Sequence, residues 1–148
     1  MSEQAQLNWV EKQHRAEKHL NDSKAEMWHD ICGSLADAAR SFNKLYGGKT
    51  ESIPKNGHRF RIVLHEQDRK RLIDVDFDDQ SCTITSEYDA SPQGSRIFHL
   101  TADHTSAFFI DKSGNRLTAD QVSQAILTPS FFPGPPSVYA NRGPLIVG

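Results

Sequence analysis

A stripe of apolar side chains at helical spacing constrains this sequence more than any other feature. Between residues 28 and 45 the apolar positions follow each other at intervals of three and four residues, which places them on one face of an α-helix. Ser23 and Glu26 stand in a capping-box relation and predict the start of this helix, and Gly47 predicts its end. The stripe consists of Trp28, Ile31, Leu35, Ala38, Phe42 and Leu45.

The residues before this helix, 1–22, are predicted to form an exposed helical arm. Leu7, Val10 and His14 continue the three-four spacing, but polar residues occupy the next positions on that face. Such a helix buries little apolar surface by itself. We therefore expect the arm either to pack on a partner or to fray.

The middle of the chain alternates between apolar and polar residues, as strands do. In 58–66, for example, Phe60, Ile62 and Leu64 point to one side, and Ile73, Val75 and Phe77 of the next segment do the same. Short linkers predict antiparallel pairing of neighbouring strands. The predicted strands are 58–66, 71–77, 82–85, 96–101 and 107–110.

The sequence therefore predicts an α+β fold in which a long N-terminal amphipathic helix packs on an antiparallel meander of about five strands. A capping box at Thr118 and Gln121 opens a short C-terminal helix that runs to about Leu127. We expect one domain over 23–127 and an extended proline-rich tail over 128–148. The tail also holds apolar residues, so part of it is expected to lie against this domain or a neighbouring subunit.

Several classes of protein are excluded or disfavoured by composition. No apolar run exceeds four residues, whereas a transmembrane helix needs about 20. The polar N-terminus lacks the order of a signal peptide, and Cys32 and Cys82 form neither a disulfide framework nor a CxxC pair, so a cytoplasmic location is expected. The net charge of −2 argues against a polybasic nucleic-acid binder.

Candidate chemistry is confined to charged residues and histidines of the strands. Asp74 and Asp76 share one strand face and are hard ligands for divalent cations, but the rest of a calcium loop is missing. Opposite charges on facing strands stabilise an antiparallel pair, so we expect Arg59 and Arg61 to pair with these aspartates. The histidines show no local zinc spacing. We therefore assign no catalytic residue, metal or cofactor.

The leading hypothesis is a non-enzymatic binding or protein-interaction module, forming a homodimer or binding a protein partner, that acts through an open sheet face and the C-terminal tail. Swapped arms between two subunits would explain both the arm and the apolar tail. One alternative is a metal-assisted or acid–base hydrolase using the aspartates and a histidine. Another is a single-stranded nucleic-acid binder that uses the basic strand 55–71. The predicted surface comprises Arg59, Arg61, His65, Asp74, Asp76 and His99.

Overall fold

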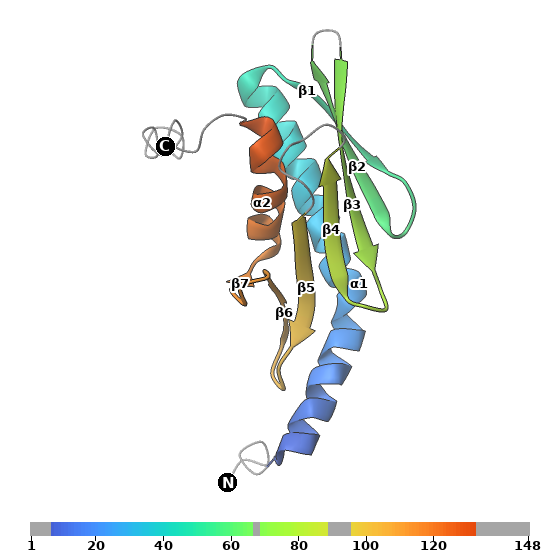
Figure 1. The fold of residues 1–148 in the computed structure, drawn as a ribbon, viewed down its shortest axis with the longest axis vertical. Coiled ribbons are helices and arrows are strands. Elements are labelled where there is room, and N and C mark those ends of the chain that lie inside the picture. The colour runs from blue at the N-terminus through green and yellow to red at the C-terminus, as the bar shows by residue number, and fades with distance from the viewer. Residues whose placement is uncertain (1–6, 67–68, 89–95, 133–148) are drawn as a thin grey trace, which may run out of the picture.

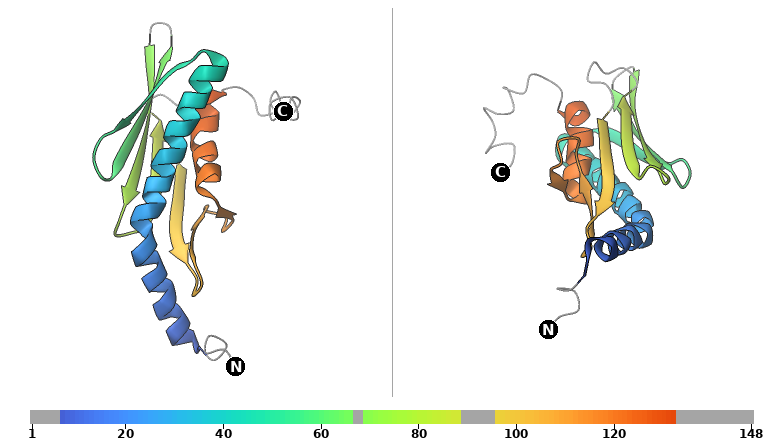
Figure 2. Two further views of the ribbon diagram at one scale, coloured as in Figure 1. Left: turned by 180° about the vertical axis from the view of Figure 1, so that it is seen from behind. Right: turned by 60° about the horizontal axis from the view of Figure 1, so that its bottom comes forward.

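The computed structural model describes residues 7–66, 69–88 and 96–132, which form two layers (Figure 1). One layer is an antiparallel sheet of seven strands, and the other contains α1 (Trp9–Tyr46) and α2 (Ala119–Phe131) on a single face of that sheet (Figure 2). The predicted α+β class is confirmed, with seven strands rather than about five. The strands pair in chain order: β1 (Lys49–Pro54), β2 (Arg59–Glu66), β3 (Arg69–Asp78), β4 (Thr83–Tyr88), β5 (Arg96–Ala102), β6 (Ala107–Ile110) and β7 (Arg116–Leu117).

Helix α1 starts much earlier than the capping signal at Ser23 predicts. Asn8 is the N-cap: its side chain accepts a hydrogen bond from the Glu11 backbone N–H at 2.9 Å, and the Glu11 side chain accepts one from the Asn8 backbone. The prediction that Ser23 starts the helix is wrong because a capped run of good helix formers precedes it and carries the helix through it. The predicted end is confirmed, since Gly47 is the C-cap at φ +67°.

The core lies between α1, α2 and one face of the sheet. Trp28 stacks on Phe77 with ring centroids 5.6 Å apart, and its indole N–H donates to the carbonyl of Gly57 at 3.0 Å. The predicted inward set is confirmed for both central strands, where Ile62, Ile73 and Val75 are fully buried. Leu45 was predicted to continue the buried stripe of α1, but it is 73% exposed.

Strand β1 was missed because it is an edge strand with little apolar alternation. Its backbone is held by the last turns of α1 rather than by a further strand. The Asn43 side chain accepts from the Thr50 backbone N–H and donates to the Thr50 carbonyl, both at 2.8 Å. An amide that mimics a neighbouring strand satisfies groups that an edge strand would otherwise expose.

Helix α2 begins as predicted and ends later than predicted. The capping box of Thr118 and Gln121 is present, with bonds of 2.8 and 3.1 Å. The helix continues past Leu127 to Phe131, with Pro129 inside it, so residues 128–131 are helical rather than part of an extended tail. The rest of the predicted tail, 133–148, lies outside the described residues, and the three-part division of the chain stays a prediction. No helix in the described ranges has both the length and the apolar character needed to cross a membrane.

Candidate functional site

Four of the predicted surface residues meet on the face of the sheet that the helices leave open. Register pairs Arg59 with Asp76 and Arg61 with Asp74 across β2 and β3. Each guanidinium binds its carboxylate through two atoms: Nε to Oδ1 at 2.6 and 2.7 Å, and Nη2 to Oδ2 at 3.1 and 3.0 Å. The expected cross-strand pairing is therefore confirmed.

These ion pairs change what the carboxylates can do. The hydrogen bond from Arg61 lowers the pKa of the Asp74 carboxyl, with the charges of Arg61 and Arg59 adding to the effect. The hydrogen bond to Asp76 raises the pKa of Arg59, and the hydrogen bond to Asp74 raises the pKa of Arg61. A carboxylate with a lowered pKa is a weaker general base, and both of its oxygens are already hydrogen-bonded. The four residues thus form a structural charge cluster.

The two predicted histidines lie away from this cluster. His65 is at the other end of β2, where its Nε2 lies 3.0 Å from a carboxylate oxygen of Glu51. His99 is on β5, opposite Thr83 of β4 and Ile110 of β6, so β4 separates it from β3. The six predicted residues share one face but do not converge on one point. Nowhere in the described ranges do three or more His, Cys, Asp or Glu side chains gather as a metal site would require.

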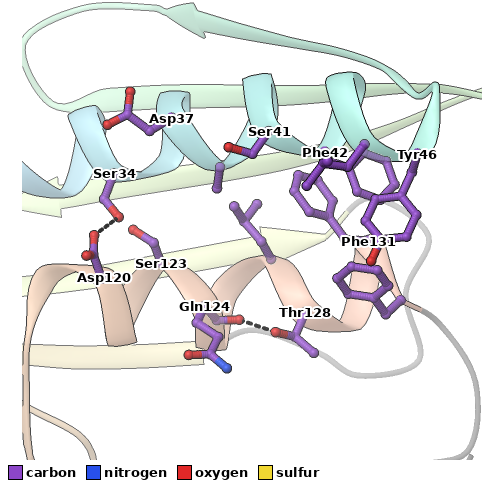
Figure 3. Close-up of a pocket in the computed structure, with 14 residues that line it drawn as sticks. Ser34, Asp37, Ser41, Phe42, Tyr46, Asp120, Ser123, Gln124, Thr128 and Phe131 are labelled. Atoms are coloured by element: carbon purple, nitrogen blue, oxygen red, sulfur yellow. Dashed lines mark hydrogen bonds between the residues drawn. The ribbon is translucent and has the colours of Figure 1, made fainter. Parts of the chain in front are cut away.

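A groove of about 450 Å³ lies on the other side of the molecule, between α1 and α2 (Figure 3). The two helices run side by side there, and their facing side chains form its walls. Pockets of about 300–1,000 Å³ are the usual size for ligand sites. The groove is lined by Ser34, Asp37, Ala38, Ser41, Phe42, Leu45 and Tyr46 from α1 and by Asp120, Ser123, Gln124, Leu127, Thr128, Phe131 and Phe132 from α2 and its C-cap.

One end of the groove is aromatic. Phe42 stacks on Phe131 with ring centroids 4.2 Å apart, and Phe132 meets Tyr46 edge-on at 5.3 Å. Despite these contacts Tyr46 is 59% exposed, as is most of Leu45 beside it. Large apolar side chains that stay open to water at the rim of a groove mark a surface suited to binding.

The other end of the groove is polar. Ser34 donates a hydrogen bond to Asp120 at 2.6 Å, and Ser123 points toward this pair (Figure 3). Ser123 is 2% exposed, yet its Oγ has no hydrogen-bond partner among the residues that the structure describes. A buried hydroxyl without a partner costs about 1–3 kcal/mol, so it calls for an explanation. Among the described residues, Asp120 forms no ion pair, whereas Asp37 is paired with Arg40.

A second hollow, between α1 and the β1–β2 hairpin, lacks this signature. Its volume is about 650 Å³, and Trp28, Cys32 and Phe60 are among its walls. None of its lining residues carries a buried polar atom without a partner. The groove between the helices is therefore the better candidate site.

Sequence reasoning missed the groove because it assigned the residues of the groove elsewhere. Phe42 and Leu45 were placed in the core stripe, and Phe131 and Phe132 were placed in the tail. One signal in the sequence could have located the groove. These side chains come after the last residues of their helices that face the sheet. No protein-family model, curated protein or solved structure matches this chain, so these side chains and their geometry carry the functional argument.

Proposed function

We propose that this protein is a non-enzymatic binding module whose site is the groove between α1 and α2. The ligand it suits is a protein segment that presents an aromatic or aliphatic side chain next to a positively charged one. The observation that carries the proposal is the hydroxyl of Ser123, which has no hydrogen-bond partner within 7–66, 69–88 and 96–132 and is buried beside Asp120 in a groove whose other end is aromatic.

The two ends of the groove would contribute differently to binding. Covering an apolar side chain at the aromatic end contributes about 1.5–3 kcal/mol. A cation or other donor at the polar end would satisfy Ser123 and Asp120, which gives orientation more than affinity. Together they would select a ligand by the spacing between its apolar and charged groups.

Both alternative functions lack a comparable observation. The hydrolase alternative needs a free carboxylate, but Arg61 holds both oxygens of Asp74 and lowers its pKa. The nucleic-acid alternative needs free cations, but Arg59 and Arg61 are neutralised by their aspartates. The binding module therefore remains the leading hypothesis. Its proposed site, however, is now the groove between the helices instead of the open face of the sheet. A cytoplasmic location stays our expectation, supported by two free thiols, Cys32 and Cys82.

Tryptamine, an indole with an ammonium group, is a minimal probe for this site. We expect it to bind the ¹⁵N-labelled full chain weakly and to shift the amide signals of Leu45, Ser123 and Asp120. Indole-3-acetate, which carries a carboxylate instead, should bind more weakly. Asp120→Asn should remove this preference and keep an acceptor for Ser34.

A matched pair of variants locates the binding. Leu45→Gln should weaken tryptamine binding by about fivefold, which corresponds to about 1 kcal/mol of lost apolar contact. Ile97→Gln is the control, because Ile97 is also an exposed large apolar residue, at 43%, but lies on the open face of the sheet. Equal effects of the two substitutions, or shifts confined to the sheet, would contradict the proposal.

A further inference from the structure

The described part of the chain ends at the aromatic end of the groove. Phe132 is the C-cap of α2 and lines this end, and residues 133–148 follow it directly. A binding segment within 133–148 is therefore tethered to the wall of the groove by a short stretch of chain. The sequence of these residues shows what such a segment can offer.

The side chains of residues 133–148 match the two ends of the groove. They include one aromatic side chain, Tyr139, and one charged side chain, Arg142. The groove has an aromatic end, and at its polar end Asp120 forms no ion pair among the described residues. Opposite charges attract more strongly where protein partly replaces water. The chain thus carries, close to the groove, one group suited to each end.

The spacing of these two groups fits the length of the groove. Along α1, Ser34 at the polar end and Phe42 at the aromatic end are eight residues apart, which is about 12 Å. Tyr139 and Arg142 are three residues apart, which is about 10 Å in an extended chain. The long side chain of Arg142 covers the remaining distance.

The direction of the chain requires a reversal after α2, and the sequence favours one. Both helices run from the polar end to the aromatic end (Figure 1), so a segment that follows α2 must turn back to run along the groove. Proline and glycine occupy 133–136; proline cannot continue a helix, and Pro-Gly and Gly-Pro dipeptides are typical of turns. The seven residues from Phe132 to Tyr139 span at most about 25 Å, which is enough to turn and place Tyr139 at the aromatic end.

We infer that residues 138–142 of the same chain occupy the groove. The inference rests on the proposed function and names the resident occupant of that site. Tyr139 packs at the aromatic end beside Leu45, and the guanidinium of Arg142 donates to the Asp120 carboxylate and to Ser123 Oγ. A short tether gives the segment an effective concentration of about a millimolar, which favours the same chain over a second copy. An external protein segment binds by displacing residues 138–142.

Disulfide trapping tests the contact directly. In the full chain with Cys32→Ser and Cys82→Ser, the pair Leu45→Cys and Tyr139→Cys should oxidise to an internal disulfide and keep the mass of one chain. Ile97→Cys with Tyr139→Cys is the matched control, because Ile97 is also exposed but lies on the open face of the sheet. The control should oxidise at least about tenfold more slowly. Equal rates, or a product that joins two chains, would overturn the inference.

Substitutions within 138–142 provide a second measurement in the ¹⁵N-labelled full chain. Tyr139→Ser should shift the amide signal of Leu45 and raise the affinity for tryptamine about fivefold, because the groove is then open in more of the molecules. Arg142→Gln should shift the amide signal of Ser123 instead. Ile146→Ser, outside the segment, is the control and should change neither signal nor affinity.

The outcomes separate this inference from the proposed function. If Tyr139→Ser changed neither the Leu45 signal nor tryptamine affinity, residues 138–142 would be refuted as the occupant, while binding of tryptamine in the groove would still support the proposed function. If tryptamine failed to bind in the groove even of the Tyr139→Ser chain, the proposed function would be refuted and the inference with it.

Discussion

The side chain of Asn43 joins the end of α1 to the edge strand β1, and replacing it tests this part of the account of the fold. Its amide bonds both backbone groups of Thr50 at 2.8 Å and so occupies the edge of β1. Asn43→Ala removes both bonds. Thr50 is only 8% exposed, so water cannot fully replace the lost partner.

The size of the effect follows from the two bonds. A neutral hydrogen bond contributes about 0.5–1.5 kcal/mol net, so the two together contribute about 1–3 kcal/mol. Alanine is a better helix former than asparagine, and this difference raises the free energy of unfolding by up to about 0.7 kcal/mol. We expect a net loss of about 1–2 kcal/mol and a melting temperature lower by about 3–6 °C.

Urea and thermal unfolding, followed by circular dichroism, measure this loss. Asn21→Ala is the matched control, because Asn21 is an exposed residue of the same helix with no side-chain hydrogen bond among the described residues. It should gain a few tenths of a kcal/mol from helix propensity alone. If Asn43→Ala proved as stable as Asn21→Ala, the proposed closure of the β1 edge by Asn43 would be refuted.

Two further predictions concern titratable groups. The hydrogen bond from Arg61 keeps the folded-state pKa of Asp74 below its ordinary value of 3.8. The pair therefore stabilises the fold above about pH 4, and this stabilisation disappears as the pH falls through the lower, folded-state pKa. Asp74→Asn should lower the free energy of unfolding by about 1 kcal/mol at neutral pH, with a deficit that shrinks in urea titrations as the pH falls below the ordinary carboxyl pKa of 3.8; a deficit independent of pH would contradict this. Burial raises the pKa of the Cys32 thiol from 9.0 to about 11, so at pH 8 iodoacetamide should alkylate it, in a Cys82→Ser chain, about a hundredfold more slowly than glutathione. A rate within tenfold of glutathione would contradict the burial of this thiol.

Local sequence signals predicted the elements whose side chains face a continuous core. The alternation through Phe60 and Ile62 on β2, and through Ile73 and Val75 on β3, identified the inward face of the sheet, and these residues are buried. Register then followed from the short connection between the two strands, which is why the pairing of arginines with aspartates could be predicted.

Signals failed where a residue is stabilised by a partner distant in sequence. Strand β1 has no apolar alternation, and it exists because Asn43 and β2 satisfy its backbone. The Ser23 pattern does not start the helix because another cap, Asn8, lies upstream in a segment with weak amphipathic character, and the helix continues through Ser23. Capping patterns have the same local form whether or not the chain uses them.

The sequence by itself determined the α+β class, the end of α1 at Gly47, the start of α2 at Thr118 and the inward face of the central strands. These features follow from backbone conformation and from side-chain periodicity over a few residues. Only the tertiary structure decided that Leu45 faces a groove instead of the core, and that Ser123 is buried beside Asp120 with no hydrogen-bond partner in the described part of the chain. The physical reason is that these side chains come from segments about 80 residues apart, and whether each meets the sheet, the other helix or water depends on how α1 and α2 pack.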